Sequence, residues 1–203
     1  MHVEITRGKC AATAVLALLL SLFGSDARAK DKTSVADYET IQAALDANHG
    51  RLVFVPAGDY EISEKLRVRG VGSGLYGPGR IVQTESNQPV IEFEDAVGAE
   101  IRDLTLTRSP GNVETDCEGI LAINCRDLIL ENVRVIDNRT RSGAITLRDC
   151  TGSRISRCLV RNYMRVTVDD RTASADWGYA FNCTDGTGIG VSRCVGTLIE
   201  SNR

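Results

Sequence analysis

The chain has 203 residues, a formal net charge of −3 and 42% hydrophobic residues. This length suits one domain behind a short leader, and the slight negative charge argues against nucleic acid as a partner, since nucleic-acid binding normally needs a basic face. Arginines are frequent in the second half. They predict either a locally basic surface that meets an anionic polymer or a solvated face of alternating charges.

Residues 1–29 predict a secretory signal peptide. Arg7 and Lys9 form a positive start, the apolar run Cys10–Phe23 follows, and an A-x-A cleavage site ends at Ala29. The apolar run is too short to anchor the chain across a bilayer. We therefore expect a secreted or periplasmic monomer with no membrane partner after cleavage.

Residues 30–50 predict an N-terminal capping segment with an amphipathic helix over 37–48. Asp37 is a suitable N-cap, and Gly50 follows the end of the helix. One face of this helix is apolar, comprising Tyr38, Ile41, Ala44 and Leu45. Such a helix suits a lid over the open end of stacked strands, whose backbone would otherwise lack partners.

Residues 51–203 predict a stack of short strands, because apolar residues alternate and Gly, Asn, Asp and Ser interrupt them. The pattern recurs at offsets of 29 and 25, and a fourth copy at 187–194 aligns with 151–158 at an offset of 36. Three apolar columns result: Ile101, Leu130, Ile155; Leu104, Val133, Cys158; and Leu106, Val135, Val160. We predict an all-β fold, a right-handed single-stranded parallel β-helix. A β-sandwich is the alternative.

Six cysteines remain after export: Cys117, Cys125, Cys150, Cys158, Cys183 and Cys194. The repeat stacks Cys125 on Cys150 and puts Cys158 in the column of Cys194. Export favours disulfides, but stacked side chains that point the same way fit disulfide geometry badly. We expect free stacked thiols. The spacing matches no zinc motif.

Two segments carry a family resemblance. Tyr38–Ala47 is an IQ-A-hydrophobic helix, and Gly50–Tyr60 contains the strand and turn V-x-V-P-x-G-x-Y. Together they resemble the start of the pectate-lyase-like superfamily, which implies a right-handed β-helix over about 34–203 and a polysaccharide substrate or ligand. The superfamily includes lyases, polygalacturonase-type hydrolases, epimerases, tailspikes and non-enzymatic binders. The hydrolase motifs G-H-G and R-I-K and the epimerase motif D-P-H-D do not occur in the chain.

The candidate site is the longest insertion, 161–180, because long loops on a rigid solenoid commonly carry function. Asp169, Asp170 and Arg165 are the candidate catalytic residues. Aromatic rings would stack on sugars, and arginines would pair with uronate carboxylates. The candidate substrate-binding residues are Tyr163, Arg171, Asp176, Trp177 and Tyr179. The alternative is a charged surface loop.

Two mechanisms fit these residues. In a lyase, Arg165 would remove the proton α to a uronate carboxylate. A Ca²⁺ ion held by Asp169, Asp170 or Asp176 would neutralise that carboxylate, so Ca²⁺ is a possible cofactor. In a hydrolase, two carboxylates would act across the glycosidic bond. Adjacent aspartates on a strand point to opposite faces, so the hydrolase needs a loop there.

Two further features bear on function. The loop 109–118 clusters Glu114, Asp116 and Glu118, which predicts either a cation site or a solvated turn. The chain stops just after a predicted strand with no C-terminal capping segment, so an exposed last coil is expected. Three functions stay open: an enzyme acting on acidic (uronate) glycans by lyase or hydrolase chemistry, a non-catalytic carbohydrate- or surface-binding β-helix, and an inactive, truncated fragment of a longer enzyme.

Overall fold

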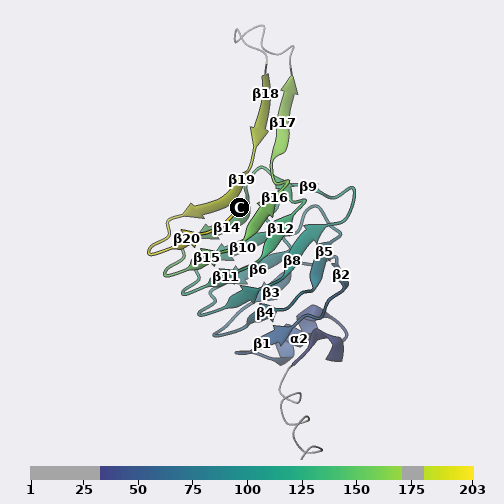
Figure 1. Ribbon diagram of the computed structural model, residues 1–203, viewed down its shortest axis with the longest axis vertical. Helices are drawn as coiled ribbons and strands as arrows, with labels where there is room; N and C mark the ends of the chain where they lie inside the picture. The colour runs from purple at the N-terminus through teal and green to yellow at the C-terminus, as the bar shows by residue number, and fades with distance from the viewer. Residues whose placement is uncertain (1–32, 171–180) are drawn as a thin grey trace, which may run out of the picture. The chain divides into compact units, whose positions relative to one another are not determined.

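A computed structural model describes residues 33–170 and 181–203 of the protein (Figure 1). Short parallel strands wind into a right-handed parallel β-helix, which confirms the predicted fold class. The predicted signal peptide lies outside the described residues. Among the described helices, none is both long and apolar enough to cross a membrane.

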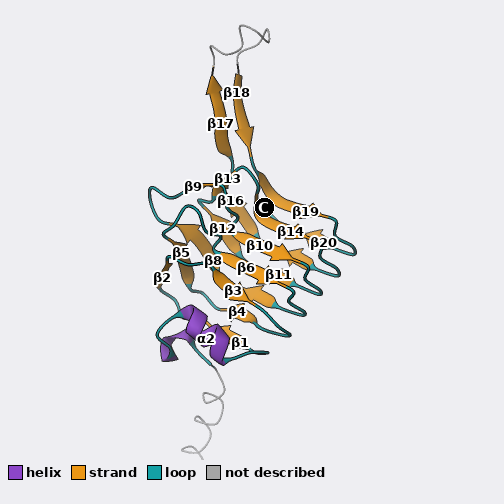
Figure 2. Cartoon of the chain, turned by 180° about the vertical axis from the view of Figure 1, so that it is seen from behind, coloured by secondary structure: helices purple, strands orange, loops and turns teal. Residues whose placement is uncertain are grey.

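Three parallel sheets, here named A, B and C, form the walls of the solenoid (Figures 1 and 2). Sheet A comprises β1 (Leu52–Phe54), β4 (Gly74–Tyr76), β7 (Glu100–Arg102), β11 (Ile129–Glu131), β15 (Arg154–Ser156) and β20 (Leu198–Glu200). Sheet B comprises β2 (Asp59–Ile62), β5 (Arg80–Gln83), β8 (Thr105–Arg108), β12 (Arg134–Ile136) and β16 (Leu159–Arg161). Sheet C comprises β3 (Leu66–Val68), β6 (Ile91–Glu94), β10 (Ile120–Ile123), β14 (Gly143–Arg148) and β19 (Thr187–Ser192).

Two smaller sheets lie between sheets B and C along the chain. The parallel pair is β9 (Glu114–Thr115) with β13 (Arg139–Thr140). The antiparallel pair is β17 (Arg165–Asp170) with β18 (Phe181–Asp185), which form a hairpin with a register shift between Val166 and Val168.

The predicted apolar columns form the core. Ile101 pairs with Leu130 and Leu130 with Ile155 on adjacent strands of sheet A, and all three are fully buried. In sheet B, Leu106, Val135 and Val160 form a second column, in which Leu106 and Val135 are buried and Val160 is partly buried. Because each coil adds its inward side chains directly above those of the previous coil, one continuous interior results.

The predicted alignment of the fourth copy is wrong by one strand. Val191 pairs with Leu147 of sheet C, whereas Ile155 pairs with Ile199, an offset of 44 and not 36. Every sheet has the same inward-outward alternation, so a slip from one sheet to the next preserves the apolar pattern and escapes a sequence comparison.

The cysteines follow the corrected register. The N–H of Cys125 donates to Sγ of Cys150, and the N–H of Cys150 donates to Sγ of Cys194, both at 3.4 Å. The predicted column of Cys158 with Cys194 is therefore wrong, and Cys158 lies beside Asn202 instead. The five cysteines with described side chains are free thiols, as expected. Burial raises the pKa of Cys158, so this thiol stays protonated and acts as a small apolar filler.

The turns between some sheets have constant lengths, whereas those between others vary in length. Every turn from sheet C to sheet A has five residues: 69–73, 95–99, 124–128, 149–153 and 193–197. From β7 onward each turn from sheet A to sheet B has two, and its first residue is in the left-handed region: Asp103, Asn132 and Arg157. Asn and Asp tolerate this conformation well, and the Asn132 side chain donates to Asp103 at 2.7 Å. The number of residues per coil therefore varies because the turns between sheets B and C differ in length.

The N-terminal cap is shorter than predicted. A 3-10 turn, η1 (Val35–Asp37), precedes the helix α2 (Ile41–Ala47), so the helix predicted over 37–48 begins later. Asp37 is not its N-cap, because the Thr40 hydroxyl accepts the N–H of Ala43 at 3.0 Å. The buried face of α2 covers the first coil with Ile41, Ala44 and Leu45.

Gln42 explains how the cap closes the open strand edge. Its Oε1 accepts the N–H of Arg67 at 2.8 Å, and its Nε2 donates to the carbonyl of Arg67 at 3.2 Å. The side-chain amide thus replaces one residue of a further strand beside β3. The carbonyl of Thr33 gives β1 a similar partner by accepting the N–H of Phe54 at 2.8 Å.

We expect Gln42→Ala to destabilise the fold by about 1–2 kcal/mol, because two main-chain groups of the edge strand lose their partners. Urea unfolding should show a lower midpoint with an unchanged slope. Gln42→Glu keeps the acceptor but turns a carboxylate oxygen toward the Arg67 carbonyl and Oδ1 of Asp46, which both now accept from Nε2, so its midpoint should be no higher than that of Gln42→Ala. An unchanged midpoint for Gln42→Ala would show that water replaces the amide at no cost.

At the other end, apolar side chains of the last coil are exposed. Val191, Val195, Leu198 and Ile199 are each at least 42% exposed. The main chain of Arg203 pairs with β16, since its carbonyl accepts the N–H of Val160 at 2.7 Å.

Candidate functional site

The variable turns between sheets B and C form one corner of the solenoid, which we call the insertion corner. It comprises 109–119, 137–142 and the described parts of 162–186. Figure 2 shows β9, β13 and the hairpin β17–β18 on this edge, and Thr140 bridges to Met164. Insertions on a rigid scaffold are where binding residues concentrate.

Arg165 lies at the base of the hairpin and contacts the loop that precedes β10. Its Nη1 is 2.8 Å from Oδ1 of Asp116 and donates to the carbonyl of Thr115 at 3.2 Å. Its Nε is 3.8 Å from Oε2 of Glu114. The structure therefore joins two segments, 161–180 and 109–118, that the sequence offered as separate candidates.

Two more arginines complete an arginine–carboxylate cluster, comprising Glu114, Asp116, Arg139, Arg141 and Arg165. Arg139 Nη1 is 3.0 Å from Oε1 of Glu114, and Arg141 Nε is 3.6 Å from Oδ1 of Asp116. Thr115 is buried between the two acids, so Glu114, on β9, and Asp116, directly after β9, both point outward. The side chains of Asp116 and Arg141 are 70% and 57% exposed, so the cluster is open to a ligand from solvent.

Glu118 differs from the other two acids because it is buried. Its Oε1 accepts from the Ser142 hydroxyl at 2.9 Å and from Arg148 Nη2 at 3.0 Å. These bonds fasten the end of the loop to β14. Each acid of 109–118 thus has an arginine partner, and the described residues contain no group of three or more side chains suited to a metal. The predicted cation site receives no support there.

A buried polar layer supports the insertion corner from inside. Arg108 is only 2% exposed; its Nε donates to Asn138 Oδ1 at 2.6 Å, and its other nitrogens donate to the carbonyls of Glu85 and Gln88, both at 2.8 Å. Burial lowers the pKa of Arg108 to about 10, against the opposing effect of Cys117 and Glu118. The guanidinium therefore stays charged at neutral pH and ties two loops to the coil.

Sequence reasoning missed Arg108, although a signal existed. Leu106 points inward on β8, and Arg108, two residues later, occupies the next inward position, opposite Gln83 of β5. Gln83 and Arg108 thus occupy equivalent inward positions on neighbouring strands. Two polar residues placed in this way predict a buried hydrogen-bond network, because polar groups are rarely buried without partners.

The predicted catalytic aspartates lie on the hairpin. Asp169 pairs with Asn182 and Asp170 with Phe181, so both belong to a strand and not to the loop that the hydrolase hypothesis needs. Tyr163 is half-buried and packs against the core. The other predicted binding residues lie outside the described part of the chain: Arg171, Asp176, Trp177 and Tyr179.

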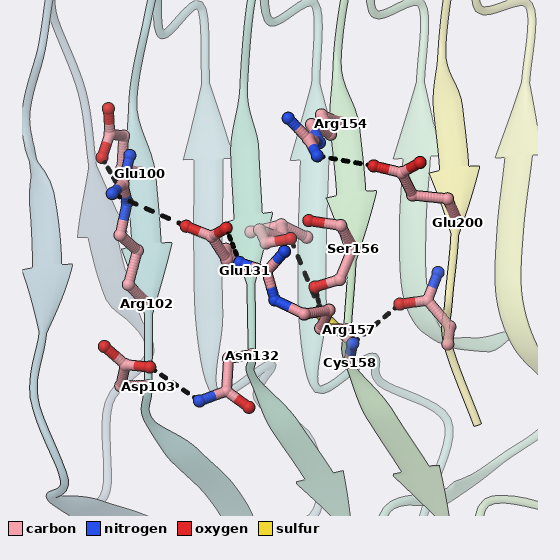
Figure 3. A network of polar contacts seen from close by, with 12 residues as sticks. Glu100, Arg102, Asp103, Glu131, Asn132, Arg154, Ser156, Arg157, Cys158 and Glu200 are labelled. Carbon is pink, nitrogen blue, oxygen red and sulfur yellow. Dashed lines mark hydrogen bonds and ion pairs between the residues drawn. The ribbon is translucent and has the colours of Figure 1, made fainter.

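A second array of charges covers the outer face of sheet A (Figure 3). Arg102 lies 2.7 Å from Glu100 and 3.5 Å from Glu131 on the next strand, and Arg154 lies 2.5 Å from Glu200. Opposite charges on adjacent strands stabilise a sheet modestly. Because no insertion adjoins this face, we assign it a structural role.

Comparisons with known proteins assign no family and no function to this chain. No protein-family model matches the sequence, and no curated protein matches it. One solved structure, described as a "putative glycosyl hydrolase" from Parabacteroides merdae ATCC 43184, is 12% identical with a TM-score of 0.45. The match covers 85% of this chain and 100% of that chain. We draw no functional argument from a similarity at this level.

Proposed function

We propose that this chain is an exported, pectate-lyase-like β-helix protein that binds an acidic polysaccharide at the insertion corner. The observation that carries the proposal is the arginine–carboxylate cluster at the base of the longest insertion. Three guanidinium groups meet there, Arg139 and Arg141 from one turn and Arg165 from the hairpin, and Arg141 is the exposed one. A uronate carboxylate is the same kind of partner for these arginines as Asp116 and Glu114 are in the free protein, and it can in addition pair with one guanidinium through both oxygens.

Binding by exchange of partners explains why the arginines are paired without a ligand. Exposed ion pairs contribute little to stability, typically about 0–1 kcal/mol each, so a ligand can replace them at small cost. Arg139 and Arg165 are also held by main-chain carbonyls, since Arg139 Nε donates to Met164 and Arg165 Nη1 donates to Thr115. These bonds fix the guanidinium groups before a ligand arrives, which lowers the entropic cost of binding.

Lyase or hydrolase chemistry on the same glycan is the second candidate. It is favoured by two carboxylates, Glu114 and Asp116, that share Arg165. Arg165 already donates to the carbonyl of Thr115 and pairs with Asp116, so it suits substrate orientation better than proton abstraction. In a lyase, Asp169 or Asp170 would supply an oxygen ligand for Ca²⁺, the hard cation that such donors prefer, but not both, because adjacent residues of a strand such as β17 point to opposite faces.

The test is a binding screen against polygalacturonate, alginate and a neutral polymer, with Arg141→Gln as the variant. We expect uronate binding that weakens about threefold or more in the variant and weakens further with salt. Arg126→Gln, an exposed arginine in a turn between sheets C and A, is the matched control and should bind normally. Equal binding of the neutral polymer would contradict the proposal.

The same mixtures, with and without Ca²⁺, separate binding from catalysis. Absorbance of an unsaturated product indicates a lyase, and new reducing ends without that absorbance indicate a hydrolase. Binding with neither signal identifies a non-catalytic binder.

A further inference from the structure

A pocket of about 570 Å³ lies between the N-terminal cap and the first coil, far along the chain from the insertion corner. Its walls come from two segments, 35–42 and 60–67. This volume falls within the range of about 300–1,000 Å³ that small-molecule sites occupy. We call it the cap pocket.

The inner part of the cap pocket is apolar and aromatic. Tyr38, Tyr60 and Ile62 are half-buried and pack against the core, and Leu66 is buried. The Tyr38 ring is fixed because its hydroxyl oxygen accepts from Asn48 Nδ2 at 2.8 Å. The pocket therefore presents aromatic surface at low entropic cost to a ligand.

The rim of the cap pocket is acidic. Glu39, Glu61 and Glu64 line it and are exposed, and within the described residues none has an ion pair or a side-chain hydrogen bond. Lys65 is neutralised by Glu92 at 2.7 Å, which leaves Arg67 as the one opposing charge of the lining. The lining therefore carries an excess of negative charge beside two tyrosines.

We propose that the cap pocket binds a ligand that carries an ammonium group on an apolar stem. The stem would lie against Ile62 and Leu66, and the cation would meet the tyrosine faces and the glutamate rim. Aromatic rings attract cations through their negative faces, and nearby carboxylates add to this attraction. A free aliphatic amine and a lysine side chain of a peptide share this chemistry. The site is independent of the proposed glycan binding, which uses other residues.

The probes are n-butylamine, n-butanol and the tripeptide Gly-Lys-Gly, titrated into the full chain by calorimetry or NMR. We expect n-butylamine to bind and n-butanol, which has the same stem without the charge, to bind at least about fivefold more weakly. Tighter binding of the tripeptide identifies a peptide as the source of the lysine group, and equal binding identifies a small amine. Equal affinities for n-butylamine and n-butanol, or no binding of either amine, would overturn the proposal.

Two sets of variants locate the site. Glu61→Gln with Glu64→Gln should weaken amine binding about fivefold and remove most of its salt dependence. Glu85→Gln removes an exposed glutamate that does not line the pocket and should change nothing. Tyr60→Phe keeps the ring and should retain binding, whereas Tyr60→Leu should lose about threefold. Full affinity in the double glutamine variant would contradict the assignment, and thermal unfolding of each variant shows whether it is folded.

Discussion

Replacing Arg108 with methionine should cost about 3–5 kcal/mol of the free energy of unfolding, the largest single effect we expect outside the apolar core. Methionine fills much of the same volume but cannot donate a hydrogen bond. Asn138 Oδ1 and the carbonyls of Glu85 and Gln88 would then lie without their donors. The turn that holds Asn138 and the loop that holds Glu85 and Gln88 would both lose a contact with β8.

Urea unfolding measures this loss, and Arg134→Met is the matched control. Arg134 occupies an outward, exposed position of β12 in the same sheet, so its replacement should stay within about 0.5 kcal/mol. Arg108→Met should also weaken glycan binding, because the insertion corner depends on the buried layer. A loss below about 1 kcal/mol would mean that water satisfies the freed carbonyls.

We expect Gly74→Ala to cost about 3 kcal/mol or more, because a methyl group has no room at this position of sheet A. Gly74 pairs with Leu52 on one side and Glu100 on the other, and an added Cβ would overlap the main-chain carbonyl of Glu100. Since that neighbour is backbone, β4 and β7 would have to separate locally.

Gly190→Ala is the matched control, because Gly190 is also a strand glycine and the nearest atom to its added Cβ is Thr146 Oγ1 at 4.0 Å. This replacement should be neutral or slightly stabilising, since alanine lowers the entropy of the unfolded chain. Thermal unfolding of the two variants side by side checks the difference. Similar melting temperatures would contradict the steric argument.

The sequence predicted the coil well because the fold repeats a simple physical rule. Leu130 must pack between Ile101 and Ile155, and this stacking imposes visible columns on the chain. Alignment by apolar columns fails after Val160, because the β17–β18 hairpin interrupts the repeat there. The strand after the hairpin has the same apolar alternation as the strands of the other sheets. Periodicity alone cannot then tell whether Val191 belongs with Ile155 or with Leu147. Hydrogen-bond register decides it.

The candidate site was predictable only in pieces. Arg165 stood out because it lies in the longest insertion, and Asp116 stood out as one of three close acids. Their contact joins residues 49 positions apart, and the intervening coil sets that distance. No local pattern encodes such a contact. The cap was predicted in part: its apolar face was correct, whereas the N-cap residue Thr40 and the contact of Gln42 with Arg67, 25 positions away, were not predicted.

The constant turns have a consequence for how this molecule can change. In the coils from β7 onward, where these turns have constant lengths, adding one residue between sheets C and A, or between sheets A and B, would turn the following strand over and place its charged side chains inside. Residues added between sheets B and C leave both neighbouring strands in place, as the 25 residues of 162–186 demonstrate. From β7 onward, two corners of the solenoid therefore have turns of constant length, and only the insertion corner varies in length. Added loops that change binding specificity, whether evolved or engineered, are therefore expected at the insertion corner.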